Sequence, residues 1–332
     1  MDRFKALVVD KHDSGVNLGF QDWSADQLLD GDVTIRVAYS SVNYKDALAT
    51  LPDGRVARRY PLIPGIDLSG TVVESRSPDF SPGQPVVAHG YELGVSHHGG
   101  YAELARVPAG WVVPLPNGMT LRQAMVIGTA GFTAALSVAQ LERMGLTPAA
   151  GTVVVTGASG GVGSIAVAIL AARGYTVAAS TGSPEAHDFL RRLGAAEIVD
   201  RAETSTPSDR PLDRARWAGA VDAVGGPTLA NLIATTQTGG SIAISGNVGG
   251  AAVNTTVLPF ILRGVNVLGI DSANYPIADR IRLWNRLADD LRPPRLEETI
   301  AHEVSLEQVP DVLGEIHRGA VRGRAVVRVG GA

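Results

Sequence analysis

A strand, a glycine-rich loop and a helix follow one another in the middle of the chain. The apolar run Val153–Thr156 leads into the loop 157–163, and residues 164–173 have the apolar composition of a buried helix. Glycines at these spacings allow a tight turn and let the backbone approach a pyrophosphate, whose charge the N–H groups and the positive end of the helix dipole stabilise. In this context the spacing is typical of a Rossmann domain that binds a dinucleotide.

Short apolar strands alternate with helices on both sides of this loop. Strands are predicted at 152–156, 175–180, 197–200, 218–224, 241–245 and 265–271, and helices at 129–144, 164–173 and 183–194. Such alternation predicts an α/β fold with a doubly wound parallel sheet. Residues 1–125 instead show half-buried strands, such as 33–37, in which every second residue is apolar.

The length of 332 residues exceeds what one ordinary hydrophobic core supports, so we predict two domains. Residues 1–125 together with the tail 273–332 form a mainly β domain, which the closing strand at 325–329 rejoins. Residues 126–272 form the Rossmann domain.

Charge and cysteine content exclude several classes of protein. The net charge is -4 without a long Lys/Arg run, so nucleic acid is not expected as a partner. No signal peptide is visible and no apolar stretch approaches the roughly 20 residues that cross a bilayer, which predicts a cytoplasmic protein without a membrane partner. The absence of cysteine excludes disulfides, thiolate zinc sites and a cysteine nucleophile.

The glycine loop also fits a second class of protein, because it satisfies the G-x-S-x-G elbow of serine hydrolases with Ser159 as nucleophile. Asp222 or Asp271, followed by His302, would supply the acid and the base in the right chain order. The elbow does not need the later glycines, and a hydrolase leaves the β-rich first domain without a role. A serine hydrolase is therefore the distant alternative.

The end of the second Rossmann strand indicates NADPH rather than NADH. NAD-binding domains usually place Asp or Glu there to hold the ribose hydroxyls, whereas residues 180–183 read Ser-Thr-Gly-Ser. A carboxylate would repel a 2′-phosphate, while hydroxyl groups can form hydrogen bonds with it. Arg201, just after the third strand, is the nearest guanidinium in this topology, and we predict that it binds the 2′-phosphate.

Motifs spread over nearly the whole chain resemble one family. They are the segments 41–46 (SVNYKD), 64–70 (PGIDLSG), 99–103 (GGYAE), 127–134 (IGTAGFTA), 216–222 (RWAGAVD) and 259–265 (PFILRGV), together with the glycine loop. The chain resembles a zinc-independent medium-chain dehydrogenase/reductase of the acrylyl-CoA reductase group, whose members were formerly called quinone oxidoreductases. Where zinc-dependent relatives have Gly-His-Glu, this chain has Gly65-Ile66-Asp67, so the resemblance implies no metal. It also implies a GroES-like first domain and a homodimer.

The resemblance implies a set of cofactor contacts. They are Tyr44, Ser159, Gly160, Gly161, Val162, Thr181, Gly182, Ser183, Arg201, Asn247, Ile261, Ser272 and Arg318. The group typically has arginine where Ser183 stands and leucine where Asn247 stands. The first difference gives Arg201 a larger share in binding the 2′-phosphate.

Reduction of an enoyl thioester places negative charge on the thioester oxygen, and without a metal neutral donors must stabilise that charge. Asn43 and Tyr44 are the predicted catalytic residues; their alternative roles are a turn cap and a packed aromatic ring. The proton donor is Tyr44 or water. Asp46 and Asp67 are expected to fix loops or pair with Lys45 rather than act as acids or bases.

The substrate prediction follows from the resemblance to the acrylyl-CoA reductase group, and a basic loop offers a site for the coenzyme. Arg55, Arg58 and Arg59 are concentrated near Asn43, and we predict that they bind the phosphates of coenzyme A. The predicted reaction is NADPH-dependent reduction of acrylyl-CoA, or a similar short 2-enoyl-CoA, to propionyl-CoA by hydride transfer to the β-carbon. A quinone or enone reductase and an NADPH-binding protein without turnover are the alternatives.

Overall fold

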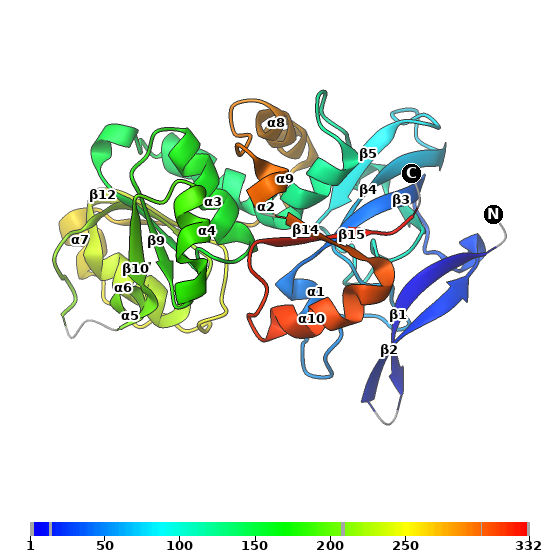
Figure 1. Ribbon diagram of the computed structural model, residues 1–332, viewed down its shortest axis with the longest axis horizontal. Coiled ribbons are helices and arrows are strands. Elements are labelled where there is room, and N and C mark those ends of the chain that lie inside the picture. Colours follow the sequence, from blue (N-terminus) through cyan, green and yellow to red (C-terminus); the bar gives the residue numbers. More distant parts are fainter. Residues whose placement is uncertain (1–2, 13–14, 207–209, 300, 331–332) are drawn as a thin grey trace. The chain divides into compact units, whose positions relative to one another are not determined.

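The computed structural model describes residues 3–12, 15–206, 210–299 and 301–330. Their contacts divide the chain into two compact units (Figure 1). The first unit comprises Met1–Thr129, Ala273–Ala288 and Ala301–Ala332, and the second comprises Ala130–Ser272 and Asp289–Ile300. The predicted division at residues 126 and 273 differs from these units chiefly in 289–300, a segment whose contacts are with the second unit.

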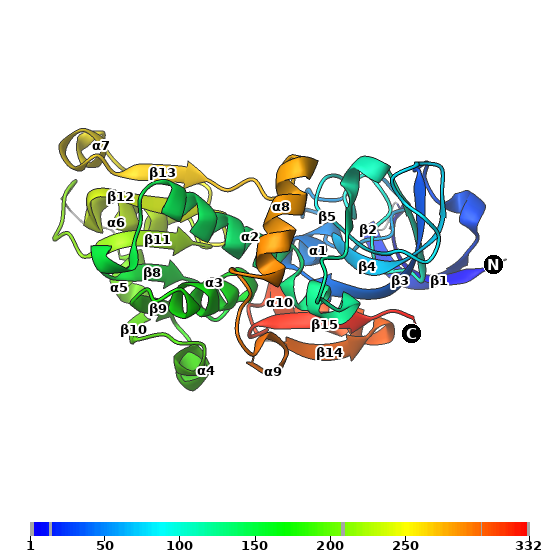
Figure 2. The same cartoon turned by 90° about the horizontal axis from the view of Figure 1, so that it is seen from above.

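A six-stranded parallel sheet forms the core of the second unit. The strand order is β10-β9-β8-β11-β12-β13, and the strands follow one another in this order in Figure 2. This is the doubly wound order, in which ligands bind at the carboxyl ends of the strands where the order reverses, here between β8 and β11. The predicted α/β fold is confirmed. The strands are Val153–Thr156 (β8), Val177–Thr181 (β9), Glu197–Asp200 (β10), Trp217–Asp222 (β11), Thr236–Ile244 (β12) and Asn266–Gly269 (β13).

Helices connect these strands. The helix α3 begins directly after the glycine loop and packs against β8, β9 and β11, which explains why its residues are almost all apolar. The helices α5 and α6 contact each other and pack against β9 to β12. The helices of this unit are Gly161–Ala172 (α3), His187–Arg192 (α4), Arg201–Ser205 (α5), Gly226–Thr235 (α6), Leu258–Arg263 (α7) and Leu296–Thr299 (α9).

The first unit is mainly β, as its alternating apolar residues predict. The hairpin of β1 and β2 forms a separate sheet, and the larger sheet has the order β14-β15-β3-β4-β5-β7, with β6 paired to β3. The tail of the chain completes this sheet, because β15 pairs antiparallel with β3. The strands are Phe4–His12 (β1), Gly15–Trp23 (β2), Val33–Val42 (β3), Asp67–Ser75 (β4), Pro85–His89 (β5), Leu104–Val107 (β6), Val112–Pro114 (β7), Ala301–Ser305 (β14) and Arg324–Arg328 (β15).

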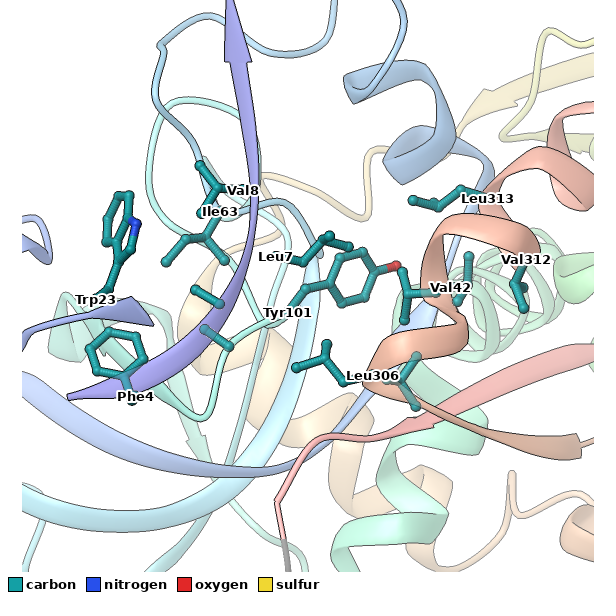
Figure 3. Close-up of a cluster of buried hydrophobic side chains, with 14 of the residues drawn as sticks. Phe4, Leu7, Val8, Trp23, Val42, Ile63, Tyr101, Leu306, Val312 and Leu313 are labelled. Atoms are coloured by element: carbon teal, nitrogen blue, oxygen red, sulfur yellow. The ribbon is translucent and has the colours of Figure 1, made fainter. Parts of the chain in front are cut away.

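An apolar cluster holds two helices of the first unit, α1 and α10, against its strands. Tyr101 lies inside this cluster between Leu7 and Val42, and its hydroxyl group points toward Val42 (Figure 3). Leu313 joins the cluster from α10, which also contacts α1. The helices are Tyr44–Ala49 (α1), Ile277–Ala288 (α8) and Val309–His317 (α10). The 3-10 helices of the chain are Ala25–Gln27, Ala109–Trp111, Pro148–Ala150, Pro184–Ala186 and Leu306–Gln308.

The helix α2, Leu121–Arg143, is broken at Gly128, which has φ 51° and ψ -160°. The sequence predicts only the part after this glycine. Contrary to the expectation that no apolar stretch is long enough to cross a bilayer, α2 passes that test by length and composition. In this structure 83% of its apolar window is buried in the protein, as in the core helix of a globular domain.

Candidate functional site

The carboxyl edge of the parallel sheet carries the glycine loop. Gly160 is the N-cap of α3, and the N–H groups of the first turn, including those of Gly161 and Val162, have no partner within the helix. Gly163 packs so closely on the loop that a Cβ there would lie 2.3 Å from the carbonyl oxygen of Gly157. The loop therefore needs glycine, and its backbone donors fit a pyrophosphate.

Thr181, at the end of β9, joins the glycine loop to the following turn. Its hydroxyl oxygen lies 3.3 Å from the hydroxyl oxygen of Ser159 and accepts a hydrogen bond from the backbone N–H of Ser183 at 3.2 Å. The structure thus brings Ser159, Thr181, Gly182 and Ser183 to one corner of the sheet. This corner has hydroxyl groups where an NAD-binding domain usually has a carboxylate.

Arg201 lies over this corner. It follows β10, whose last residue pairs in register with Thr181 of β9. A Cβ on Gly182 would lie 2.7 Å from Cζ of Arg201, so the guanidinium covers the glycine directly. Arg201 is exposed, and within the described part of the chain it has no ion pair. Its charge can therefore bind an anionic ligand beside the hydroxyl groups.

The loop lacks the geometry of a serine hydrolase. A nucleophile elbow holds its serine on a strained turn. The backbone of Ser159 shows no such strain: the non-glycine residues with positive φ in the described ranges are Arg55, Tyr91 and Arg295. Asp222 accepts hydrogen bonds from the hydroxyl of Thr156 and from the next backbone N–H groups, and its burial raises its pKa. It fixes the turn after β11, and these contacts count against the hydrolase alternative.

Three further predicted cofactor contacts lie elsewhere in the second unit. The hydroxyl of Ser272 accepts a hydrogen bond from the hydroxyl of Thr133 at 2.7 Å. Asn247 is exposed in the turn after β12, and Ile261 is 69% exposed on α7. Their contacts with a cofactor stay predictions.

In the first unit, Asn43 lies in a buried polar network. It is the N-cap of α1, and its backbone N–H donates to Oδ2 of Asp46 at 2.8 Å. Its side-chain Nδ2 donates to Oδ2 of Asp67 at 2.8 Å and to Oδ2 of Asp46 at 3.3 Å. Both amide hydrogens are thus directed at carboxylates. The turn-cap role considered for Asn43 is present, and its catalytic role stays a prediction.

Asp67 receives many donors. It accepts from the hydroxyl groups of Ser41 and Thr129 at 2.5 Å each and from the backbone N–H of Thr129 at 3.1 Å, and Nη2 of Arg324 lies 3.5 Å away. Asp67 therefore fixes loops, as expected, but its cationic partner is Arg324 and not Lys45. In the parts of the chain that the structure describes, no group of three or more His, Asp or Glu residues could hold a metal ion.

Asp46 is fully buried beside this pair. Its Oδ1 accepts from the backbone N–H of Ile66 at 2.8 Å, and its Oδ2 accepts from the hydroxyl of Tyr101 at 3.1 Å. Burial, reinforced by the charge of Asp67, raises the pKa of Asp46 to about 7. Burial and the neighbouring Asp46 also raise the pKa of Tyr101 well above its usual range.

Tyr44 and Arg318, both predicted cofactor contacts, belong to neighbouring elements of the first unit. Tyr44 is the half-buried first residue of α1, and its ring stacks on that of His317 with the centroids 6.2 Å apart. His317 ends α10, and the exposed Arg318 follows it as the C-cap. The phenol of Tyr44 and the imidazole of His317 are therefore paired at the start of α1, whereas Nη1 of Arg318 lies over Gly314 of α10, 3.4 Å from the position of a Cβ there.

The three arginines of the predicted CoA site are exposed in the loop after α1. Arg55 has φ 54°. Arg58 lies 3.6 Å from Glu92, while within the described residues Arg55 and Arg59 have no ion pair. The loop presents a positive surface, and one of its charges is partly neutralised.

Sequence reasoning missed Arg324, Thr129 and His317. The burial of Arg324 could have been suspected from the sequence, because this residue directly precedes the apolar run of a closing strand. A charged side chain at such a place is buried only with a partner. Its partner Asp67 likewise opens an apolar strand. The sequence does not reveal that these two strands place their charges together.

Two family models match the chain. The alcohol dehydrogenase GroES-like domain matches residues 29–117, and the zinc-binding dehydrogenase model matches residues 161–289. The first match falls on the mainly β unit, and the second covers most of the Rossmann-like unit and continues through α8 of the first unit.

Relatives match over nearly the full length. The acrylyl-CoA reductase AcuI of Ruegeria pomeroyi is 50% identical over 98% of this chain and 99% of its own. The crystal structure of the yhdH oxidoreductase of Salmonella enterica in complex with NADP is 46% identical with a TM-score of 0.96, covering 98% of this chain and 100% of that one. The Bacillus subtilis protein yhfP with NAD bound is 50% identical with a TM-score of 0.96, covering 99% and 100%. The chain therefore belongs to the medium-chain dehydrogenase/reductase superfamily, as an oxidoreductase of the zinc-independent acrylyl-CoA reductase and quinone oxidoreductase group.

Proposed function

We propose that this protein reduces the C=C bond of acrylyl-CoA, or of a similar short 2-enoyl-CoA, with NADPH, giving propionyl-CoA. The main support is the full-length similarity to an acrylyl-CoA reductase, joined with a glycine-loop edge that fits a nicotinamide dinucleotide. Free enones and quinones are the alternative acceptors, since they need the same hydride chemistry but no site for coenzyme A.

NADPH is the proposed cofactor because of the corner formed by Thr181, Gly182 and Ser183 under Arg201. A guanidinium beside hydroxyl groups suits a 2′-phosphate, and residues 180–183 themselves carry no carboxylate that would repel it. One solved relative has NADP bound and another has NAD bound, so the preference has to be measured on this chain.

The remaining chemistry falls to residues of the chain. When bound, the cofactor supplies a hydride for the β-carbon of the acceptor. Tyr44 is the proposed donor to the thioester oxygen, on which negative charge develops, because its hydroxyl is not committed to the buried carboxylates as the amide of Asn43 is. The α-carbon then takes a proton from Tyr44 or from water. The Arg55, Arg58 and Arg59 loop is proposed to bind the CoA phosphates.

The assembly we propose is a homodimer in the cytoplasm, formed through one edge of the second unit. Residues 247–262 contain no charged side chain, and Val257, Ile261 and Leu262 are 66%, 69% and 62% exposed. They adjoin β13, which ends the parallel sheet (Figure 2). An apolar edge of this kind fits a second copy around a two-fold axis. Leu262→Asp is expected to convert the dimer to a monomer in light scattering.

The proposal is tested by following NADPH oxidation with acrylyl-CoA, free acrylate and a simple quinone. We expect kcat/KM to be highest for acrylyl-CoA and to fall for acrylate, which lacks the coenzyme. Neutralising the three arginines together is expected to raise the KM for acrylyl-CoA and leave that for the quinone unchanged. A quinone used better than the thioester would favour the alternative.

A further inference from the structure

Arg324, on the strand β15 near the end of the chain, is a buried cation that makes an unusually complete set of contacts. Its side chain is 2% exposed and each of its three nitrogens donates. Nε donates to the carbonyl oxygen of Val126, and Nη2 to the hydroxyl of Ser41 at 2.6 Å. Burying an ion pair contributes little net stability, because the desolvation cost offsets the attraction. The contacts of Arg324 are therefore better explained by a role in holding the surrounding backbone in place than by a gain in stability.

The contacts of Arg324 converge on the residues before α1. Nη1 donates to the carbonyl oxygen of Val42 at 3.1 Å and to Oδ1 of Asn43 at 2.9 Å. The second contact determines which way the amide of Asn43 faces, since it requires an acceptor toward Arg324. Nδ2 consequently faces Asp46 and Asp67. Arg324 thus fixes the N-cap of the helix whose first residue is Tyr44.

The same ion pair fixes the break in α2. A Cβ on Gly128 would lie 2.5 Å from Oδ2 of Asp67 and 2.6 Å from Nη2 of Arg324. With its φ of 51°, Gly128 lets the backbone pass directly over the pair, where a side chain would clash. Thr129, the last residue of this part of the first unit, donates to Asp67. One buried cluster therefore holds both the start of α1 and the break in α2.

We propose that Arg324 is a positioning residue for the hydroxyl of Tyr44, acting through Val42 and Asn43. This inference rests on the proposed function, in which Tyr44 contacts the acceptor. Arg324 itself, being buried, does not touch the substrate. Its side chain keeps the first turn of α1 in the one orientation that serves the reaction.

The test compares Arg324→Lys with Arg280→Lys. Arg280 is the matched control, because it is equally buried (0% exposed) in the same unit but donates to the carbonyl oxygens of His89 and Ala273. Its link to the Asp67 cluster is indirect, through the ring of His89, which lies 3.3 Å from the hydroxyl of Thr129. Arg324→Lys is expected to lower kcat by about 10-fold to 100-fold, as a displacement near 1 Å does in other enzymes. The dissociation constant of Arg324→Lys for NADPH should equal that of the wild type. The kcat of Arg280→Lys should also be unchanged.

A double-mutant cycle separates positioning from general loss of structure. In a Tyr44→Phe background, Arg324→Lys is expected to cause no further loss of kcat, since the group that it positions is absent. An equal loss in both backgrounds would overturn the proposal. Circular dichroism and thermal melting show whether each variant is folded.

A measurement independent of turnover uses 3-fluorotyrosine in place of the seven tyrosines. The ¹⁹F resonance of Tyr44, assigned by its absence in Tyr44→Phe, should shift in Arg324→Lys and not in Arg280→Lys. An unshifted resonance would contradict positioning even if activity fell. If the wild-type protein reduced no acceptor, the proposed function would fail, while the resonance would still decide the role of Arg324.

Discussion

The two regions that carry the candidate functional residues, one in each unit, are encoded differently. In the second unit, the dinucleotide edge is built from short contiguous pieces, the glycine loop and the turn after β9, which the parallel sheet brings to one edge. In the first unit, the polar cluster joins Asn43, Asp67, Thr129 and Arg324, which are separated by up to 281 positions. A local motif predicts chemistry from the sequence alone, whereas a dispersed cluster becomes visible only when the strands pair.

The first prediction, with the largest expected effect, tests whether the carboxyl group of Asp46 in the dispersed cluster takes up a proton near neutral pH. Asp46 has its pKa raised from 3.8 to about 7 in the folded protein, so the folded state binds more protons between these pH values. The contribution of Asp46 to the free energy of unfolding should therefore fall as pH rises through this window and become constant above it. The contribution is at most about 4 kcal/mol, since one pKa unit corresponds to about 1.4 kcal/mol.

Asp46→Asn should remove this part of the pH dependence. The measurement is urea denaturation of the wild type and the variant at several pH values between 4 and 7, with the exposed Asp53→Asn as control. If the free energies of unfolding of the wild type and Asp46→Asn changed with pH in parallel, Asp46 would not have the raised pKa that its burial implies.

The second prediction asks whether the cluster serves catalysis through Tyr44. Tyr44→Phe is expected to lower kcat for acrylyl-CoA by about 10²-fold to 10³-fold, the usual loss when one donor to a developing oxyanion is removed. Steady-state NADPH oxidation measures it, and Tyr39→Phe on β3 is the control outside the network. Activity near the wild-type value would contradict this role for Tyr44 and leave water as the donor to consider.

The third prediction tests the contiguous edge. Arg201→Ala is expected to weaken NADPH binding by about 10-fold or more, because a charge-assisted hydrogen bond contributes about 1.5–3 kcal/mol. NADH binding should change little. Fluorescence titration with both cofactors checks this, with the exposed Arg214→Ala as control. Equal losses for the two cofactors would remove the argument for a 2′-phosphate site.

The same contrast explains how much could be predicted. The alternation after Gly128 gave the parallel sheet, because each apolar run there is buried as a strand or a helix. The strand β2 was missed, since its glycines and polar residues hide a half-exposed hairpin partner of β1. The first part of α2 was missed because Gly128 reads as a helix boundary, although the helix resumes after it.

The functional residues show the same difference between local and non-local information. Asn43 and Tyr44 were found through the resemblance, but the sequence did not show that both amide hydrogens of Asn43 face carboxylates. Arg324 was missed entirely, because its meaning depends on the pairing of β15 with β3 across most of the chain. Non-local pairing of this kind leaves no local pattern to detect.

The proposed reaction is hydride transfer from the nicotinamide to the β-carbon of a short enoyl thioester. Its most direct test is a turnover with NADPH deuterated at the transferred position of C4 and acrylyl-CoA as acceptor, followed by NMR of the product. We predict propionyl-CoA with one deuterium at C3 and a solvent-derived hydrogen at C2. Deuterium at C2, its loss to solvent, or no labelled product would contradict the account.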